Sequence, residues 1–144
     1  MKLPYRILLA LVAALALGLS LSSAAMAVRA KAAAPVIKLN DRTFGEILST
    51  RGHQALYYWN VEKEANGRVR CTGACAKAWP PLFTRSAASV PKRLPGIAGT
   101  FGTIKRPDGR LQVTHRGLPI YTYAHELPNQ VLCNDVDGWF VVRV

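Results

Sequence analysis

Residues 57–62 read Tyr-Tyr-Trp-Asn-Val-Glu, and residues 121–126 read Tyr-Thr-Tyr-Ala-His-Glu. Both stretches follow an Arg-Gly pair and share the pattern Tyr-x-aromatic-x-x-Glu. A pattern repeated in this way usually means that one supersecondary unit is used twice. Because side chains alternate along a strand, the two rings of each copy should point to the same face. We expect each glutamate to close the bend that follows, by accepting a hydrogen bond from a tyrosine hydroxyl or a turn amide. The motif residues are Tyr57, Trp59 and Glu62 in the first copy and Tyr121, Tyr123 and Glu126 in the second.

Turn signals around the two motifs predict a small, mostly β, antiparallel domain of two related hairpin units. The clearest hairpin joins residues 100–105 to residues 110–115 through a Pro-Asp-Gly turn. In such a turn proline presets the entry, aspartate bonds to its own backbone and glycine takes the left-handed position. In the first unit Gly52 is expected to supply a turn residue with positive φ. Residues 139–144, rich in β-branched and aromatic residues, are expected to form the last strand.

One short helix near residues 72–79 should interrupt the strands. Its alanines favour helix, and Pro80 and Pro81 force it to end. The segment 28–43 is Ala-rich and basic at its start and is expected to be a flexible lead-in. A single β domain is then expected over residues 44–144.

The first 27 residues have the layout of a secretory signal peptide. Lys2 and Arg6 precede an unbroken apolar and small-residue run at 7–19, and the segment ends in Ala-Met-Ala. The run is shorter than the roughly 20 residues that a membrane-spanning helix needs. We therefore expect cleavage after Ala27, no transmembrane segment in the mature chain, and a periplasmic or secreted location.

The composition describes an ordinary globular protein that is strongly basic. Of 144 residues, 50% are hydrophobic, and 19 basic residues against 8 acidic ones give a net charge of +11. A basic cytosolic protein would suggest nucleic acid as a partner. An exported one meets anionic lipid headgroups or cell-wall polymers through the same long-range attraction. Anionic envelope components are thus the expected partners, and nucleic acid is not. The alternative is a charge that only maintains solubility, and no oligomeric state is indicated.

The three cysteines cannot all pair within one chain, although an oxidising compartment allows disulfides. Cys71 and Cys75 are four residues apart, which is close enough for a bridge if Cys75 lies in the first turn of the helix. We expect a permanent disulfide between them, with Cys133 free or paired between chains. The alternative is a redox or metal-handling protein that uses Cys71 and Cys75, because a helix N-terminus lowers the pKa of a thiol.

Metal ligands are sparse. A copper or zinc site built from Cys75, His125 and Cys133 is conceivable, but the histidines lack metal-binding spacing, and neither a metal nor another cofactor is expected. His115 alternates with apolar residues on one face of its strand. A hydrogen-bonded core histidine is the better interpretation of His115.

Hydrolytic catalysis finds little support, because no nucleophile elbow, zinc motif or phosphate loop is present. Glu62 and Glu126 would form a carboxylate pair if the repeats faced each other, which is the basis of the alternative of a small cell-wall hydrolase. Trp59, Trp79 and Trp139 could line a groove for sugars. In a domain of this size they are more simply explained as core, since each buries about 200 Å².

These motifs together resemble a bacterial secreted-repeat family, usually described as predicted lipoproteins with a Tyr-x-aromatic-x-x-Asp motif. The most specific part is residues 71–81, which read Cys-Thr-Gly-Ala-Cys-Ala-Lys-Ala-Trp-Pro-Pro between the two copies. The resemblance covers about residues 44–144 and implies an extracytoplasmic β-rich module without an established activity. The chain departs from the family in four ways: both motif acids are Glu, His115 replaces a tyrosine, Cys133 is extra, and the lipid-bearing cysteine is missing. We therefore expect an exported, non-enzymatic binding or envelope-associated module.

Overall fold

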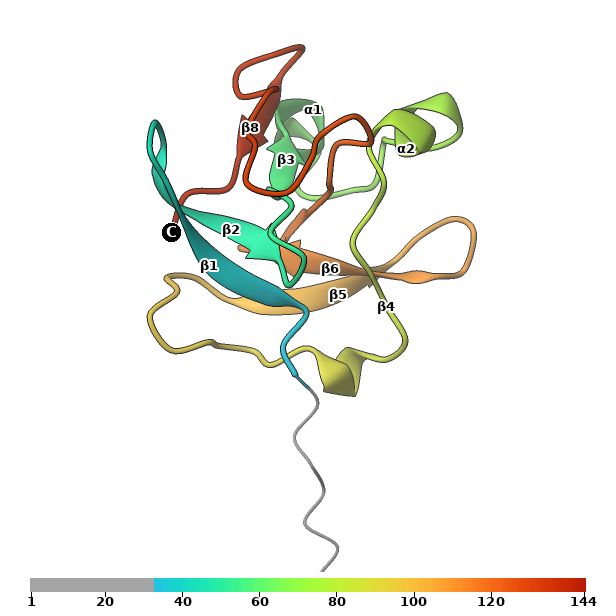
Figure 1. Cartoon of the computed structure of the whole chain (residues 1–144). Helices are drawn as coiled ribbons and strands as arrows, with labels where there is room; N and C mark the ends of the chain where they lie inside the picture. Colours follow the sequence, from blue (N-terminus) through green and yellow to red (C-terminus); the bar gives the residue numbers. More distant parts are fainter. Residues whose placement is uncertain (1–32) are drawn as a thin grey trace, which may run out of the picture. The chain divides into compact units, whose positions relative to one another are not determined.

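The computed structural model describes residues 33–144, so the expected signal peptide at 1–27 lies outside the described residues. The first hairpin joins β1 (Val36–Asp41) to β2 (Gly45–Thr50) in antiparallel register (Figure 1). Asp41 stabilises the turn, since its carboxylate accepts two backbone amides. Strand β1 lies inside the segment 28–43 that the sequence predicted to be a flexible lead-in, and that boundary was wrong. The basic, Ala-rich composition hid a strand whose first residue, Val36, is buried in the core.

The first motif forms a strand and a helix. Strand β3 (Tyr57–Trp59) pairs antiparallel with β8 (Trp139–Val141), and helix α1 (Asn60–Glu64) follows β3 directly. Helix α2 (Ala74–Ala78) is the helix expected near residues 72–79. The expectation of one helix missed α1, because a helix of five residues carries too few positions to show a period.

The remaining strands form one mixed-length antiparallel sheet. Its order is β4-β6-β5, and β7 also pairs with β6. The predicted hairpin is confirmed as β5 against β6, with Gly109 of its turn at φ +83°. The bounds are β4 Phe83–Thr84, β5 Phe101–Lys105, β6 Leu111–His115 and β7 Leu118–Pro119, with a 3-10 turn at Ala87–Ser89 before β5.

The two hairpin units have related geometry. In each unit a tight turn reverses the chain, and the residue two places before the motif tyrosine pairs back: Ala55 with Ser49, and Pro119 with Thr114. The prediction for Gly52 was wrong, because His53 (φ 63°) and not Gly52 takes the left-handed position. Ala55 and Leu56 pair with β2, and the chain then continues into β3, which pairs with β8. The hairpin of the first unit is therefore short.

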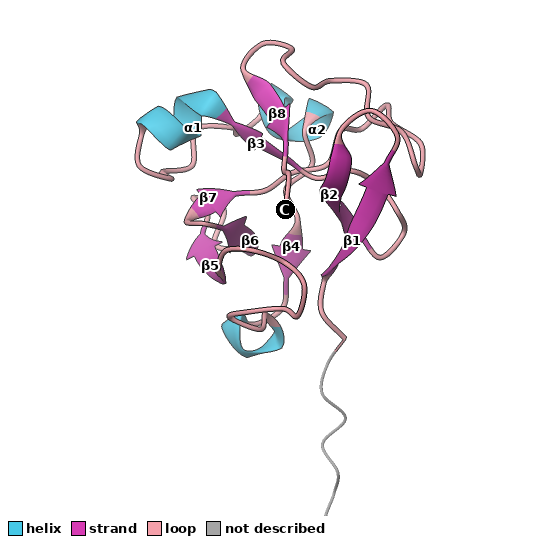
Figure 2. Cartoon of the chain, turned by 90° about the vertical axis from the view of Figure 1, so that its left-hand side faces the viewer, coloured by secondary structure: helices cyan, strands magenta, loops and turns pink. Residues whose placement is uncertain are grey.

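The core has two parts, one on each face of the two motif segments, of which the first is β3 and the second pairs only through isolated bridges at Tyr121. Consecutive residues alternate between the two parts: Leu56 lies in an aliphatic cluster and Tyr57 in an aromatic cluster, and Ile120 and Tyr121 repeat the pattern. Figure 2 shows β3, β8, α1 and α2 on one side of the domain, and β4 to β7 on the other. Within residues 33–144 no helix has the length and apolar character needed to cross a membrane.

Candidate functional site

The two motif tyrosines lie side by side in the centre of the domain. The amide of Tyr57 donates to the carbonyl of Tyr121 at 2.8 Å, and the amide of Tyr121 donates to the carbonyl of Tyr57 at 2.9 Å. Both side chains are fully buried. This reciprocal pairing places the two copies of the motif around an approximate twofold axis.

The hydroxyl groups cross over between the copies. Tyr57 Oη donates to Glu126 Oε1 at 2.5 Å, and Tyr121 Oη donates to Glu62 Oε1 at 2.7 Å. Burial, with the neighbouring glutamates, raises the pKa of both tyrosines, so the hydroxyls stay protonated and act as donors. The hydrogen bonds expected for the glutamates are therefore present, but each tyrosine serves the glutamate of the other copy.

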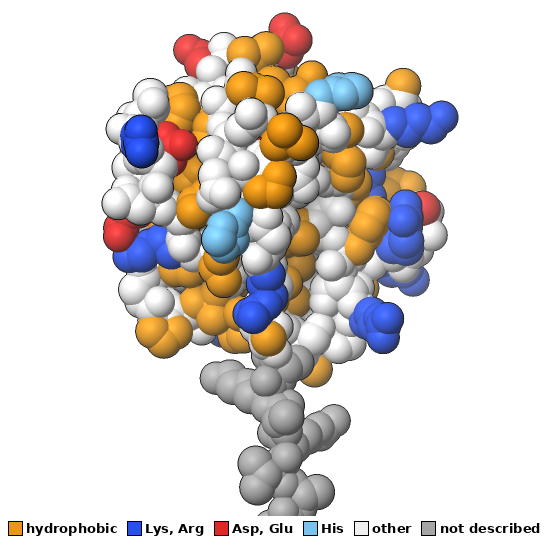
Figure 3. Space-filling view, viewed as in Figure 1, with side chains coloured by type: hydrophobic (Ala, Val, Ile, Leu, Met, Phe, Trp, Pro, Cys, Tyr) orange, Lys and Arg blue, Asp and Glu red, His pale blue; other side chains and the backbone are white. Residues whose placement is uncertain are grey.

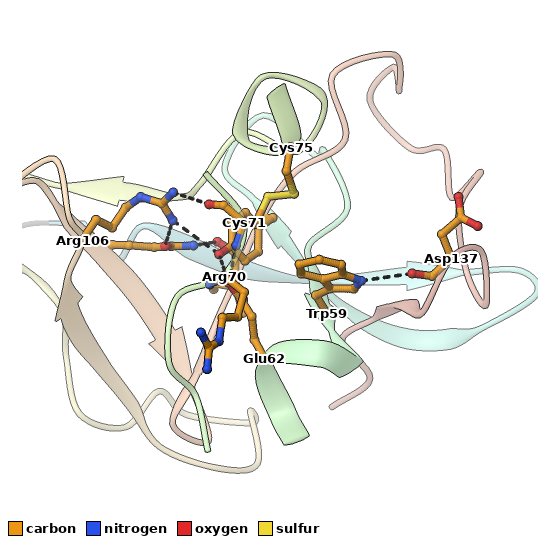
Figure 4. Close-up of a disulfide and its surroundings, with 10 residues drawn as sticks. Trp59, Glu62, Arg70, Cys71, Cys75, Arg106 and Asp137 are labelled. Carbon is orange, nitrogen blue, oxygen red and sulfur yellow. Dashed lines mark hydrogen bonds between the residues drawn. A yellow bond between two sulfur atoms is a disulfide. The ribbon is translucent and has the colours of Figure 1, made fainter. Parts of the chain in front are cut away.

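The Glu62 side of this arrangement includes a buried cation. Glu62 Oε1 also accepts the backbone amides of Arg70 and Cys71, at 2.7 and 3.0 Å. Arg106, only 4% exposed, donates to Tyr121 Oη at 3.3 Å and to the carbonyl of Cys71 at 2.5 Å (Figure 4). The tyrosine hydroxyl thus joins a guanidinium to a carboxylate, which offsets part of the cost of burying either charge.

The Glu126 side lacks such a cation. Glu126 Oε1 also accepts the amide of Leu132 at 2.6 Å. Among residues 33–144, no lysine or arginine forms an ion pair with Glu126, and its buried Oε2 accepts no hydrogen bond. Burial raises the pKa of this carboxyl despite the opposing bonds from Tyr57 and Leu132. The two related sites therefore differ in their electrostatics.

The motif rings and the tryptophans form a continuous aromatic stack. The ring of Trp139 stacks with the ring of Trp79, with centroids 3.9 Å apart, and with the ring of Trp59, with centroids 5.3 Å apart. Tyr123 lies 4.7 Å from Trp79, and Tyr57 meets Trp79 edge-on. These aromatic residues pack against one another in the core and do not line a groove for sugars.

The expected disulfide is present between Cys71 and Cys75, with their Cα atoms 5.2 Å apart. Cys71 is fully buried and precedes α2, and Cys75 is half-buried and is the second residue of that helix. The carbonyl of Cys75 accepts the amide of Trp79 at 2.8 Å, which holds the indole at the end of the helix. Pro80 and Pro81 then carry the chain along the second motif strand, which they contact through backbone hydrogen bonding.

The three candidate metal ligands do not form a metal site. In the part of the chain that the structure describes, no group of three His, Cys, Asp or Glu residues is placed to hold an ion. The sulfur of Cys75 is committed to the disulfide, and His125 is exposed beside the ring of Tyr123. Burial and the nearby Glu126 raise the pKa of the Cys133 thiol, which disfavours the thiolate that a metal requires.

The other candidate residues, Glu62, Glu126 and His115, are titratable groups buried in the core. Glu62 and Glu126 are 0% and 4% exposed, so this pair does not face an open cleft, as the hydrolase alternative required. His115 is a core histidine, as expected. Its Nε2 lies 2.8 Å from the carbonyl of Ala98, and burial lowers its pKa.

Sequence reasoning missed the main cleft of the molecule, a cavity of about 610 Å³ open to solvent. We call it the Tyr58 cleft. Its aromatic residues, Tyr58 and Phe140, occupy the strand positions that alternate with the core rings. The pattern treated Tyr58 as the unspecified position of the motif, and only the register of β3 on β8 brings Phe140 beside it. The other lining residues are Lys63, His115, Arg116, Leu118, Ile120, Asn134, Asp135, Val141, Val142 and Arg143.

The outer surface is mainly cationic. Fourteen of the fifteen lysines and arginines in residues 33–144 are exposed, and Arg106 is the buried one. Within the same residues, only Lys38 and Arg110 form ion pairs with carboxylates. Figure 3 shows the basic side chains of one face spread apart and not gathered in a single patch.

Comparisons with protein-family models, with curated proteins and with solved structures gave no match. The site must therefore be interpreted from its own geometry.

Proposed function

We propose that this protein is an exported, non-enzymatic binding module that associates with anionic components of the bacterial envelope. The observation that carries the proposal is the imbalance of exposed charge. Two of the eight acidic residues, Glu62 and Glu126, are buried, and two more are ion-paired, whereas twelve basic side chains are exposed without an ion-pair partner among residues 33–144.

The burial of the motif residues supports a role without catalysis. A general acid or base must reach the substrate to within hydrogen-bond distance. Both motif carboxylates instead point into the core, where each accepts a tyrosine hydroxyl and at least one backbone amide. The motifs therefore hold the domain together and leave binding to the surface.

The environment of the disulfide favours a structural role over the redox alternative. Cys71 is inaccessible, and its amide and carbonyl are bound by Glu62 and Arg106. A disulfide that exchanges with a partner needs an accessible sulfur and a stabilised thiolate. The signal-peptide layout, the disulfide and the resemblance to an extracytoplasmic family all support export.

The test is sedimentation of the mature protein with vesicles of phosphatidylglycerol or phosphatidylcholine, and with insoluble cell-wall material. We expect binding to the anionic vesicles and to the wall material at low salt. Binding should fall steeply above physiological salt. The distance over which exposed charges attract each other is about 8 Å at physiological ionic strength and becomes shorter as salt is added. Equal binding to neutral phosphatidylcholine, or binding that does not respond to salt, would contradict the proposal.

A further inference from the structure

We infer that the Tyr58 cleft binds an anionic saccharide, with a sugar ring on Tyr58 and Phe140 and its carboxylate or phosphate held by basic side chains at the rim. This inference rests on the proposed binding function and names its site and ligand class. The cleft has the size of a small-molecule site, since such sites typically enclose about 300–1,000 Å³.

The floor of the cleft carries two aromatic rings. Tyr58 and Phe140 are register partners on β3 and β8, and their rings stack with centroids 5.7 Å apart and an angle of 23°. Both side chains are half-buried, and the buried Ile120 and Val142 lie among the other lining residues. The negative face of an aromatic ring attracts the weakly positive C–H groups that one face of a sugar ring presents.

Two cations lie beside these rings. Lys63 extends from α1 with its Nζ 6.0 Å from the centroid of Tyr58. Arg116 belongs to the turn between β6 and β7 and also lines the cleft. Arg143 borders the cleft too, but its guanidinium lies over the ring of Phe44, outside the lining. Neither Lys63 nor Arg116 forms an ion pair with a described residue, so their donors are available to an anion. Arginine in particular matches the geometry of a carboxylate or phosphate.

The cleft also carries neutral and acidic groups that suit hydroxyl groups. The Oδ1 atom of Asn134 accepts the amide of Val141 at 3.2 Å, which fixes the side chain and leaves its NH₂ group as a donor. Asp135, the acidic residue of the lining, is exposed and can accept hydrogen bonds from hydroxyl groups. A bare phosphate would use the cations alone, whereas a charged sugar uses the cations, the amide, the carboxylate and the rings.

The first experiment compares four probes by isothermal titration calorimetry on the mature protein at low salt. The probes are glucuronate, glucose 6-phosphate, neutral glucose and inorganic phosphate. We expect both charged sugars to bind about fivefold more tightly than glucose, because two exposed charges together are worth about that factor. They should also bind more tightly than phosphate. Phosphate that binds as tightly as glucuronate would overturn the assignment of a saccharide.

The second experiment removes charge from the cleft. The cleft variant K63Q/R116N should lose about fivefold in affinity for glucuronate, the factor that two exposed charges together are worth. Asn is chosen for position 116 because φ there is +51°, a conformation that Asn tolerates. Thermal unfolding curves of separate samples first establish that the variant and the wild type are folded. Only folded protein is then titrated.

A matched control removes two exposed charges from outside the cleft. The variant R51Q/R68Q carries the same net charge as the cleft variant and should keep its glucuronate affinity within about twofold. Equal losses in the two variants would overturn the cleft assignment and leave the proposed function standing. If the wild type fails to sediment with anionic vesicles or wall material, the proposed function itself fails.

The aromatic floor is tested with Y58L and Y58F. Y58F keeps the ring and should keep the preference for glucuronate over phosphate, and Y58L should reduce it. Retained preference in a folded Y58L protein would contradict stacking. If Y58L does not fold, an F140L variant makes the same comparison from the other ring.

Discussion

The crossed hydrogen bonds between the two motifs can be tested by double-mutant cycles. Four cycles combine Y57F or Y121F with E62A or E126A. We expect Tyr121 to couple to Glu62 and Tyr57 to couple to Glu126, and the two pairs within a single motif copy to show little coupling. A hairpin unit that folded on its own would give the opposite pattern.

The magnitude follows from the geometry of the two bonds. They are 2.7 and 2.5 Å long, both partners are buried, and each acceptor is a carboxylate. Hydrogen bonds to charged groups contribute about 1.5–3 kcal/mol. The pairs that share no hydrogen bond should couple by no more than about 0.5 kcal/mol. E62A alone should cost more than E126A, because Glu62 serves three donors and Glu126 two.

The assay is urea unfolding of the mature, oxidised protein at pH 7.5, followed by tryptophan fluorescence, with free energies from linear extrapolation. Domains of this size are stable by roughly 5–15 kcal/mol, so the less severe double variants should still unfold from a native state. Coupling of Tyr57 to Glu62 that equals its coupling to Glu126 would refute the crossed arrangement. Equal and small couplings in all four cycles would refute the structural role of the motif.

Further predictions concern the cysteines, two titrating groups and export. Alkylation of the folded, non-reduced protein should modify only Cys133. After reduction and unfolding, alkylation should modify three thiols, as measured by intact mass. Reduction of the disulfide should lower the free energy of unfolding in urea by about 2 kcal/mol. Because burial raises the pKa of Glu126, its contribution to stability is fully present below the ordinary pKa of 4.5 and is lost as pH rises through the raised pKa; melting curves of E126Q should lack this loss. Because burial lowers the pKa of His115, its contribution is present above the ordinary pKa of 6.5 and is lost as pH falls through the lowered pKa; H115Q should remove this loss. N-terminal sequencing of exported protein should show cleavage after Ala27, and retention of the first 27 residues would contradict the signal peptide.

Local patterns were sufficient for much of the fold. The Pro-Asp-Gly turn between β5 and β6, the helix ended by Pro80 and Pro81, and the bridge between Cys71 and Cys75 all depend on residues close in sequence. Turn chemistry, helix termination and the reach of a disulfide are properties of such short segments. The core position of His115 followed from the same reasoning, because a period of two shows on a single strand.

Long-range partners could not be obtained in this way. Nothing in the local pattern states that β3 pairs with β8, since their register depends on contacts across most of the chain. The Tyr58 cleft follows from that pairing, and the burial of Arg106 depends on the contact of the β5–β6 turn with Cys71; both were missed. An arginine beside a turn gives no local sign of burial, because arginine side chains are mostly exposed in proteins.

The alternation of the motif strands separates stability from binding. In Tyr-x-aromatic-x-x-Glu the named residues face the aromatic core and the crossed hydrogen bonds, so a change in any of them perturbs packing first. The unnamed residue between the two aromatic residues of the first copy, Tyr58, faces the other side of the strand and reaches the cleft. In the second copy the corresponding residue, Thr122, is buried, so the two copies do not form two equivalent sites. The two copies of the pattern thus share the residues that pack the core, and they differ at the residue that alternates with them.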